Sequence, residues 1–362
     1  MNNFVKRNLK GLKKSVKSYL YDKAHRQEAL QAYNVITTQH PSRRVSVPQK
    51  KQIIGYAKEV LGSEAFAPWL FVYTACQGKF KEGWIPDNYF GRVAMPIVNK
   101  TYSLISNVKT ISSKILHTDF LPDIAYCLGG SWFNAAGTEL SETEVPGLLF
   151  GVHPEVYIKP DFSNQGRNIL IRNRDNFNPA ELVALGDFVV QAPLRQHRWF
   201  DQIIAGSLTT LRITTLKKRA QKAQSIAANL RIGRSGNRYI MSKEALKISI
   251  VDDQGTLDEY ASFPDWKTAT SHPDSGFVFK GKILPHFKQA VEVCEKLHCQ
   301  IPHFSVVGWD VAITSEEAIK IIEWNAWHPA IKFHEAMVGP CFKDMQWESL
   351  WKTRHFMPED TF

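Results

Sequence analysis

Apolar side chains recur at helical spacing at the start of the chain. Val5, Leu9, Leu12, Val16 and Leu20 are three or four positions apart, with Lys and Arg between them. This spacing places the apolar residues along one side of a helix. It predicts a helix that packs on a domain through its apolar stripe; the alternative is a basic amphipathic helix that rests on anionic lipid.

From about residue 92 the pattern changes to short apolar stretches rich in β-branched residues, which alternate with helical stretches and glycine-containing turns. Such alternation is typical of α/β and α+β domains. The predicted strands are 155–160, 187–194, 208–216, 245–253, 306–314 and 321–329.

The composition is that of a folded protein. Hydrophobic residues make up 44% and charged residues 22% of 362 residues, which is enough for two or three compact subdomains. Five cysteines are too few and too scattered for a disulfide framework. We therefore expect a reduced, cytoplasmic protein, in which Cys294, His298 and Cys299 are helix residues and not a zinc site.

The net charge of +10 favours anionic partners. Nucleotide phosphates, sugar phosphates, acidic lipid headgroups and nucleic acid all fit, so the charge alone does not choose among them. Basic and aromatic residues do not interleave as they do in an RNA-binding sheet, so nucleic acid is the least favoured partner.

Two of the predicted strands carry acidic residues within apolar sequence. A hairpin that turns near Glu316 and Glu317 places Asp310 opposite Glu323, and Asn325 then projects from the same face as Glu323. Facing carboxylates without a cation raise one another's pKa, whereas Mg²⁺ prefers such oxygen ligands. The pattern favours a magnesium site; the alternative is a pair of carboxylates on the solvent-facing side of a sheet.

A lysine and a polar loop follow one predicted strand. Lys159 lies at the end of 155–160, and the loop after it reaches Gly166. An ammonium group above free backbone N–H groups can hold a phosphate chain, although a lysine that extends from a strand end to solvent is the commoner explanation. Gln191 offers an amide to an adenine edge, unless it belongs to an ordinary strand end.

Three arginines come next. Arg212 lies inside a β-branched strand and needs an anionic partner there, either a carboxylate or a phosphate. Arg231 and Arg234 flank a glycine in the sequence LRIGRSGN. Each arginine is ambiguous when it is taken alone.

The order of these motifs resembles the ATP-grasp superfamily. Lys100 is followed by YIKPDFSNQGRNI, VVQAPL, TLRITT, LRIGRSGN, HPDSG, GWDVAIT and IIEWNAWHP. The similarity covers about residues 95–335 and is nearest to the sugar-transfer-associated ATP-grasp branch, whose members accompany genes for cell-surface polysaccharides. The chain departs from the family after LRIGR, because relatives continue with Asp-Asn and a Gly-Gly pair and this chain has neither.

The resemblance implies a nucleotide site. The residues implied to hold the nucleotide are Lys100, Lys159, Gly166, Gln191, Ala192 and Leu194. The two lysines correspond to the family's phosphate contacts, and Lys159 is also implied to take part in catalysis. Gln191 and its neighbours correspond to the segment that faces adenine.

The resemblance also implies a metal site and a catalytic arginine. Asp310, Glu323 and Asn325 match the family's Mg²⁺ ligands. Arg231 matches the arginine that steadies the negatively charged tetrahedral intermediate, and Arg212 matches a nearby arginine that binds a phosphate or the substrate.

The implied architecture is the α+β ATP-grasp fold, in which the nucleotide lies between two antiparallel sheets. We expect a mainly helical N-terminal region over 1–92, the ATP-grasp domain over 93–345 and a C-terminal tail over 346–362. Within the domain we expect a mobile lid at about 118–190 and a C-terminal metal-binding sheet at about 195–345.

The implied activity is that of an ADP-forming ligase, which joins a carboxylate to an amine through an acylphosphate with ATP and Mg²⁺. The branch implies small-molecule substrates such as an amino acid and a sugar component of a surface polysaccharide. A small-molecule kinase of the same fold and a non-enzymatic polyanion-binding protein are the alternatives. In the alternative in which the basic N-terminal helix rests on anionic lipid, it contacts the inner face of the membrane; the sequence predicts no oligomeric state.

Overall fold

A computed structural model describes residues 3–163, 168–237 and 239–353, with side chains from residue 16 onwards. The chain forms two compact units. The first, the helical unit, comprises Met1–Ile97, Asp265–Lys267 and Ala330–Phe362, and the second, the sheet unit, comprises Val98–Pro264 and Thr268–Pro329. The units divide at 97/98 and 329/330, whereas the sequence analysis placed boundaries at 92/93 and 345/346.

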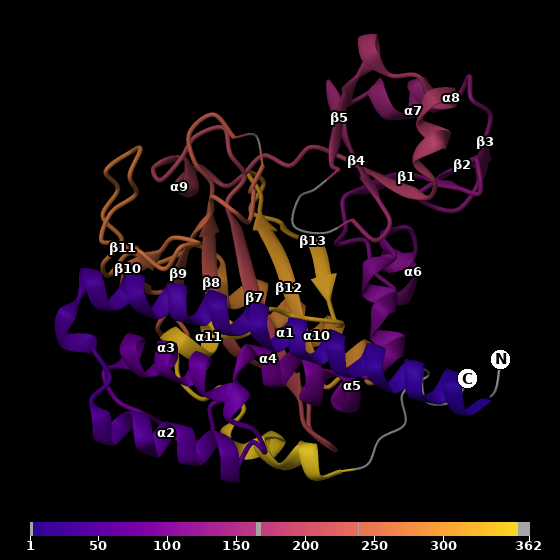
Figure 1. Ribbon diagram of the computed structural model, residues 1–362. Coiled ribbons are helices and arrows are strands. Elements are labelled where there is room, and N and C mark those ends of the chain that lie inside the picture. The colour runs from indigo at the N-terminus through magenta and orange to yellow at the C-terminus, as the bar shows by residue number, and fades with distance from the viewer. Residues whose placement is uncertain (1–2, 164–167, 238, 354–362) are drawn as a thin grey trace. The chain divides into compact units, whose positions relative to one another are not determined.

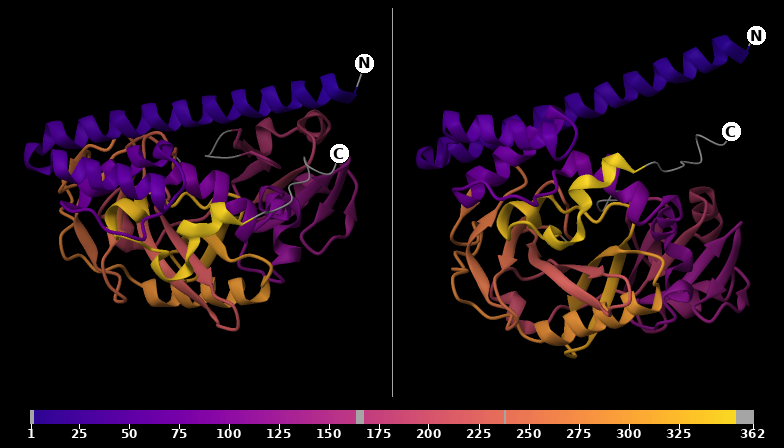
Figure 2. Two further views of the ribbon diagram at one scale, coloured as in Figure 1. Left: turned by 60° about the horizontal axis from the view of Figure 1, so that its bottom comes forward. Right: turned by 90° about the horizontal axis from the view of Figure 1, so that it is seen from below.

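The helical unit begins with the long helix α1, Asn3–Gln39, drawn in indigo in Figure 2. α2 (Val47–Glu59) and α3 (Ala67–Gln77) follow. α2 starts with a capping box, in which the side chains of Ser46 and Gln49 each accept a hydrogen bond from the other residue's backbone N–H. The predicted helical region at the N-terminus is therefore present.

The other helical segments of this unit are short. They are η1 (Pro41–Arg43), η2 (Glu64–Phe66), α4 (Asp87–Tyr89), the π-helix η3 (Phe90–Ala94), α5 (Met95–Val98), which crosses the boundary, α11 (Lys332–Met337), η8 (Lys343–Met345) and η9 (Trp347–Lys352).

A buried carboxyl group joins three segments of the helical unit. Glu335, on α11, accepts hydrogen bonds from the backbone N–H groups of Ile85 (2.9 Å) and Cys341 (2.8 Å). The Trp84 indole donates to the backbone carbonyl of Glu335 (2.8 Å). Burial raises the pKa of Glu335 to about 8, although the two N–H groups favour its charged form.

The sheet unit contains a small sheet of six antiparallel strands in the order β3-β2-β1-β6-β4-β5 (Figure 1). The strands are β1 (Asp123–Leu128), β2 (Ser131–Asn134), β3 (Glu139–Leu140), β4 (Glu155–Pro160), β5 (Leu170–Asn173) and β6 (Phe188–Gln191). The short helices of this region are η4 (Thr101–Asn107), η5 (Lys109–Ile111), α6 (Ser112–Ile115), α7 (Val145–Phe150), η6 (Arg174–Asn176), α8 (Pro179–Leu182) and η7 (Val183–Leu185). Trp132, Leu149 and Phe188 belong to the apolar core of this sheet.

The large sheet has seven antiparallel strands in the order β11-β10-β9-β8-β7-β12-β13. They are β7 (Thr210–Lys217), β8 (Ala223–Ile232), β9 (Leu246–Ile250), β10 (Leu257–Ser262), β11 (Thr268–Ala269), β12 (Val306–Ile313) and β13 (Ile319–Asn325), with helices α9 (Arg198–Asp201) and α10 (Phe287–Gln300). α10 packs on β7, β8 and β12 through an apolar core that includes Leu211, Leu230, Leu297 and Trp309. The α+β class and the two antiparallel sheets predicted from the sequence are confirmed.

Cys294, His298 and Cys299 lie on α10, as predicted for helix residues; the first two are buried and Cys299 is exposed. His298 is buried, with Nδ1 2.7 Å from Thr215 Oγ1 and Nε2 2.9 Å from the Phe304 carbonyl oxygen. Burial lowers the pKa of His298 to about 4. Both ring nitrogens are thus used in packing α10 against the sheet.

The hairpin between β12 and β13 has the predicted register. Asp310 pairs with Glu323, and Thr314 and Ala318 close the turn through a backbone hydrogen bond of 2.9 Å. Glu317 has a left-handed conformation (φ 61°), as a three-residue hairpin loop requires. The loop 315–317 is therefore centred on Glu316, within the predicted turn, and a β-bulge between Asp310 and Val311 brings Asp310 opposite Glu323.

Candidate functional site

A row of polar residues crosses five strands of the large sheet. Ser249 pairs with Asn229, Asn229 with Arg212, Arg212 with Asp310, and Asp310 with Glu323. Directly paired residues point to the same face of a sheet, so all five side chains lie on one face. Their neighbours along the strands project to the opposite face, where α10 packs. The sheet therefore has one apolar face, against which α10 packs, and one face on which these polar and charged side chains form a row.

Asp310 is neutralised by arginines. Arg212 donates to it through Nε (2.7 Å) and Nη2 (2.9 Å), and Arg231 donates through Nη1 (3.1 Å). Burial opposes the charge of Asp310, but the two guanidinium groups outweigh it and hold its pKa below the ordinary value. For the facing carboxylates the sequence predicted a metal ion or exposure to solvent, and for Arg212 an anionic partner that it left unnamed. Neighbouring strands supply protein cations as well.

Glycine at position 308 makes room for Arg212. A Cβ built on Gly308 would lie 2.8 Å from Arg212 Nη1 and 3.0 Å from Pro329 Cβ. The same Nη1 donates to the Pro329 carbonyl oxygen (3.3 Å). The Gly in GWDVAIT and the Pro in NAWHP therefore hold the guanidinium between them, in line with Asp310.

Arg231 has an unused donor. Its Nη2 donates to Ser242 Oγ (2.9 Å), but its Nε is buried without a hydrogen-bond partner in the part of the chain that the structure describes. A buried N–H without a partner is uncommon, because it loses its hydration and gains nothing in return. An anion placed beside Arg231 would satisfy it.

The HPDSG motif holds the loop that follows Arg231. Asp274 accepts two hydrogen bonds from Arg234 (2.9 and 2.7 Å) and one from the backbone N–H of Ser235 (2.8 Å). His272 Nε2 lies 3.0 Å from the Gly233 carbonyl oxygen. Arg234 and the neighbouring N–H lower the pKa of Asp274. Arg234 thus positions the loop, whereas Arg231 faces the polar row.

Two lysines, Lys109 and Lys159, interact electrostatically with Glu323. Lys109 Nζ is 3.8 Å from Glu323 Oε1, and the backbone N–H of Lys109 donates to Asp161 Oδ1 (2.6 Å). Burial lowers the pKa of Lys159 to about 8; Glu323 counteracts this effect and Lys109 adds to it.

Lys109 was missed in the sequence, and Lys100 was named instead. Lys100 is exposed and precedes η4 with a left-handed backbone (φ 57°). Within the described ranges, no ion pair joins it to Glu323. Nothing in the local sequence distinguishes Lys109 from Lys100, because Lys109 is placed by Asp161, a residue far along the chain.

A small cavity brings part of the predicted site together. It has a volume of about 10 Å³ and is lined by Ser106, Lys109, Ser112, Leu121, Gln191, Ile322, Glu323 and Trp324. Gln191 is buried in the sheet, and its Nε2 donates to Asp123 Oδ1 (2.8 Å). The amide that was predicted to face adenine is therefore engaged within the protein.

The other residues predicted to hold the nucleotide differ in their surroundings. The backbone N–H of Ala192 donates to the Pro122 carbonyl oxygen (2.8 Å) and so continues the β6 edge. Leu194 is partly buried. Gly166 lies outside the described residues.

The predicted magnesium ligands fit a hard cation. Glu323 is partly exposed, and Asp310 accepts three hydrogen bonds, which leaves lone pairs on its carboxylate. Asn325 Nδ2 is buried without a partner in the described part of the chain. Amide oxygen and nitrogen are assigned from hydrogen bonds, so a flipped Asn325 would direct its oxygen to that position. Three oxygen donors on one hairpin suit Mg²⁺.

Known structures offer distant similarities. The biotin carboxylase domain of 2-oxoglutarate carboxylase from Hydrogenobacter thermophilus has a TM-score of 0.42 at 11% identity, with 71% of this chain and 48% of that chain covered. D-alanyl-alanine synthetase A from Vibrio cholerae has a TM-score of 0.40 at 11% identity, with 83% and 73% covered. N5-carboxyaminoimidazole ribonucleotide synthetase from Thermotoga maritima has a TM-score of 0.38 at 11% identity, with 80% and 63% covered. The chain spans about half the length of the first of these.

Comparison of the sequence with curated proteins gave no match. Residues 175–344, which contain β6 to β13 and α11, match the family model described as sugar-transfer associated ATP-grasp. The polar row, the HPDSG motif and the β12–β13 hairpin all lie within this range, so the resemblance drawn from those motifs is confirmed there. Residues 175–344 of this chain are therefore similar to the sugar-transfer-associated ATP-grasp family.

Proposed function

We propose that the protein is an ATP- and Mg²⁺-dependent carboxylate–amine ligase. A substrate carboxylate oxygen attacks the γ-phosphorus of ATP, ADP leaves, and an acylphosphate forms. The amine nitrogen then attacks the acyl carbon, the phosphate leaves, and the nitrogen loses a proton to give the amide. Positioning and charge neutralisation supply most of the catalysis in such a sequence.

The observation that carries this proposal is the polar row on the large sheet. Carboxylates from β12 and β13 lie beside arginines from β7 and β8, and the cavity next to them is lined by Lys109 and Gln191. Anion-binding and cation-binding groups are thus interleaved on one buried surface. A polyphosphate with its metal ion needs both kinds of group.

Asp310, Glu323 and Asn325 would hold Mg²⁺, which neutralises phosphate charge and orients the γ-phosphoryl group when it is bound. Lys159 and Lys109 would contact phosphate oxygens, so the role first assigned to Lys100 passes to Lys109. Arg231 would direct its unpaired Nε to the negatively charged reaction centre.

The nucleotide requires the two sheets of the sheet unit to separate. The cavity volume of about 10 Å³ has room for about one water molecule, so a nucleotide does not fit between the sheets as they stand. We propose that the small sheet, with flanking residues at about 118–190, acts as the lid, and that its closure keeps water from the acylphosphate.

For the substrates, we propose an amino acid and a sugar component of a surface polysaccharide. The family description supports the link to sugar transfer. The loop that lacks the Asp-Asn and Gly-Gly elements is the one held by Asp274, which supports an acceptor different from that of better-known ligases.

The decisive experiment uses hydroxylamine as a general nucleophile. Candidate acids with ATP, Mg²⁺ and hydroxylamine should give the hydroxamate, ADP and phosphate, with none of these products when the acid is omitted. A small-molecule kinase would instead release ADP and leave a stable phosphorylated product without any nucleophile. Release of AMP and pyrophosphate would overturn the acylphosphate route.

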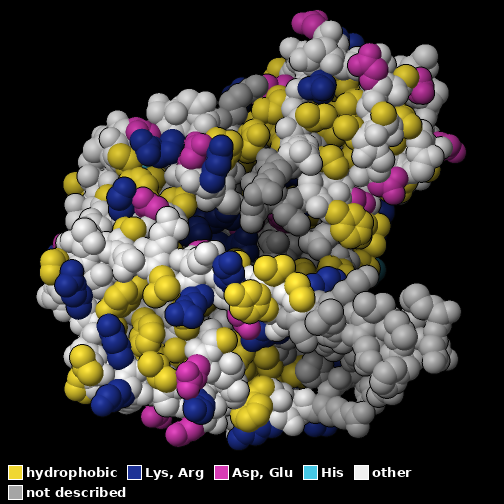
Figure 3. All heavy atoms as spheres, viewed as in Figure 1, with side chains coloured by type: hydrophobic (Ala, Val, Ile, Leu, Met, Phe, Trp, Pro, Cys, Tyr) yellow, Lys and Arg dark blue, Asp and Glu magenta, His cyan; other side chains and the backbone are white. Residues whose placement is uncertain are grey.

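A polyanion-binding role predicts salt-sensitive binding that survives Asp310→Asn and Glu323→Gln. On the face shown in Figure 3, Lys and Arg side chains are scattered among hydrophobic and acidic ones and form no single basic patch. This distribution favours the ligase.

Across the described residues, no helix combines the length and apolar character needed to cross a membrane. The cytoplasmic location and the alternative of a lipid contact by α1 stay predictions.

A further inference from the structure

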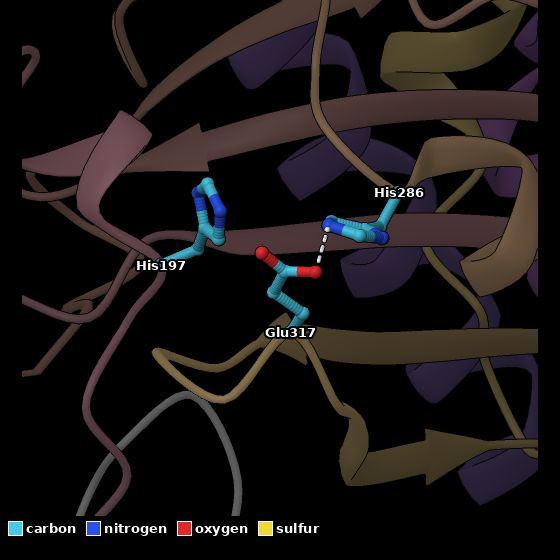
Figure 4. A group of neighbouring side chains, drawn as sticks. All are labelled: His197, His286 and Glu317. Carbon is cyan, nitrogen blue, oxygen red and sulfur yellow. Dashed lines mark ion pairs between the residues drawn. The ribbon is translucent and has the colours of Figure 1, made fainter.

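Two histidines and a glutamate converge at the tip of the β12–β13 hairpin. His197 precedes α9, His286 precedes α10, and Glu317 lies in the hairpin turn. Figure 4 shows the three side chains directed toward one another from these separate segments. One candidate ligand atom from each residue lies within 4.8 Å of the other two. None of the three belongs to the polar row.

We propose that His197, His286 and Glu317 form a binding site for a transition-metal ion of the Zn²⁺ type, with water completing its coordination. Imidazole nitrogen and carboxylate oxygen are ligands that suit such ions. In a tetrahedral site with bonds of about 2.0–2.1 Å, neighbouring ligand atoms lie about 3.4 Å apart. His286 Nε2 is already 3.5 Å from Glu317 Oε2, so that pair has the required spacing.

His197 completes the set with a small movement. Its ring centroid is 5.7 Å from that of His286. Its Nδ1 accepts a hydrogen bond of 3.2 Å from the backbone N–H of Trp199. Binding a metal would give up this long bond, because a metal-bound neutral imidazole carries its proton on the other nitrogen.

The backbone around the cluster favours a side-chain role over a local one. His286 has a left-handed conformation (φ 52°), which residues other than glycine rarely adopt. His286 is also the N-cap of α10, yet its side chain makes no capping hydrogen bond. Ser, Thr, Asp or Asn would supply that bond. The sequence instead places an imidazole there, directed at Glu317.

The ion would fasten the segment that joins the two sheets. Between β6 and β7, Arg195 accepts a backbone hydrogen bond from Ser315, and His197 donates one to Ile313 (both 2.9 Å). A metal bound to His197, His286 and Glu317 would add a third tie, between this segment, the hairpin and the start of α10. The role is structural and is separate from the proposed ligase reaction.

Titration calorimetry on the full chain tests the site, after treatment with a chelator and desalting. We expect uptake of one equivalent of Zn²⁺, and visible bands with Co²⁺ but no thiolate charge-transfer band. His286→Gln and His197→Gln should each weaken binding by at least about tenfold, since even outer partners of metal ligands cost that much. Zn²⁺ should raise the Tm of the wild type but not that of His286→Gln.

The matched control is His303→Gln, an exposed histidine of the same unit, which should keep wild-type affinity. If His286→Gln does not fold, Glu317→Gln decides, because this side chain is exposed in a turn. No uptake of Zn²⁺ or Co²⁺, or uptake that persists in the histidine variants, would show a histidine–glutamate ion pair only and would overturn the site. Mg²⁺ serves as the reference ion, since it prefers oxygen ligands.

Discussion

Asp310 in the sheet unit and Glu335 in the helical unit are both buried carboxyl groups, with exposures of 7% and 0%, but their surroundings are opposite. Asp310 has two arginines, which keep its pKa below the ordinary value. Glu335 has only N–H donors, and burial raises its pKa to about 8. No Lys or Arg within the described ranges forms an ion pair with Glu335. Burial without a cation thus raises the pKa of Glu335, whereas the arginines built into the sheet keep Asp310 charged.

Loss of Asp310 should have the largest effect. Asp310→Asn leaves Arg212 and Arg231 buried without a counter-ion, and breaking a buried ion pair costs about 3–5 kcal/mol. We expect the rate of ADP formation to fall by at least about 100-fold. The free energy of unfolding, measured with urea, should fall by the same amount, about 3–5 kcal/mol. Glu316→Gln, an exposed acid on the adjoining turn, is the control and should leave both unchanged. Wild-type stability in Asp310→Asn would mean that the arginines are satisfied elsewhere.

Glu335 should respond to pH in the direction opposite to that of Asp310. Its folded pKa of about 8 is above the unfolded value of about 4.3, so its contribution to stability is full below pH 4.3 and is lost as the pH rises through 8. Between pH 5.5 and 7.5 the helical unit should lose about 2–3 kcal/mol at about 1.4 kcal/mol per unit. Asp310, with a lowered pKa, instead loses its contribution as the pH falls.

Hydrogen exchange of the Ile85 and Cys341 backbone amides measures the pH-dependent loss of stability around Glu335, because both amides donate to Glu335. Their protection should fall over this pH range, after correction for intrinsic exchange, and Glu335→Gln should remove the dependence. A wild-type protein whose amide protection is independent of pH would show that Glu335 is charged when folded.

Lysine variants test how Glu323, the neighbour of Asp310, is neutralised. Lys109→Met should raise KM for ATP by about tenfold, equivalent to about 1.4 kcal/mol, because Lys109 borders the cavity and lies 3.8 Å from Glu323. Lys100→Met is the matched control and should change KM little, since Lys100 is exposed. Steady-state kinetics of ADP release compare the two. The reverse order would restore the assignment made from the sequence.

The two carboxyl groups also differ in how far the sequence could predict them. The hairpin and its turn at Glu316 and Glu317 were predictable from the sequence. The pairing of Asp310 with Glu323 also depends on a β-bulge between Asp310 and Val311, which the sequence did not indicate. The arginine partners of Asp310 were not, because the pairing of β12 with β7 joins segments 98 residues apart. Glu335 gave no signal, since its neutral state depends on Ile85 and on the fold of the whole helical unit.

Asp274 is paired with an arginine, as Asp310 is, but it is not buried. Its replacement should therefore have the smallest effect on stability. Like Asp310, it accepts paired hydrogen bonds from an arginine that lower its pKa, but its side chain is 21% exposed and that of Arg234 is 37% exposed. An exposed ion pair contributes about 0.2–1 kcal/mol, so Asp274→Asn should cost no more than this in urea unfolding. Activity should fall further than stability, because Asp274 also holds Ser235 in the loop after Arg231. A loss of several kcal/mol would show that pairing alone, without burial, accounts for the behaviour of Asp310.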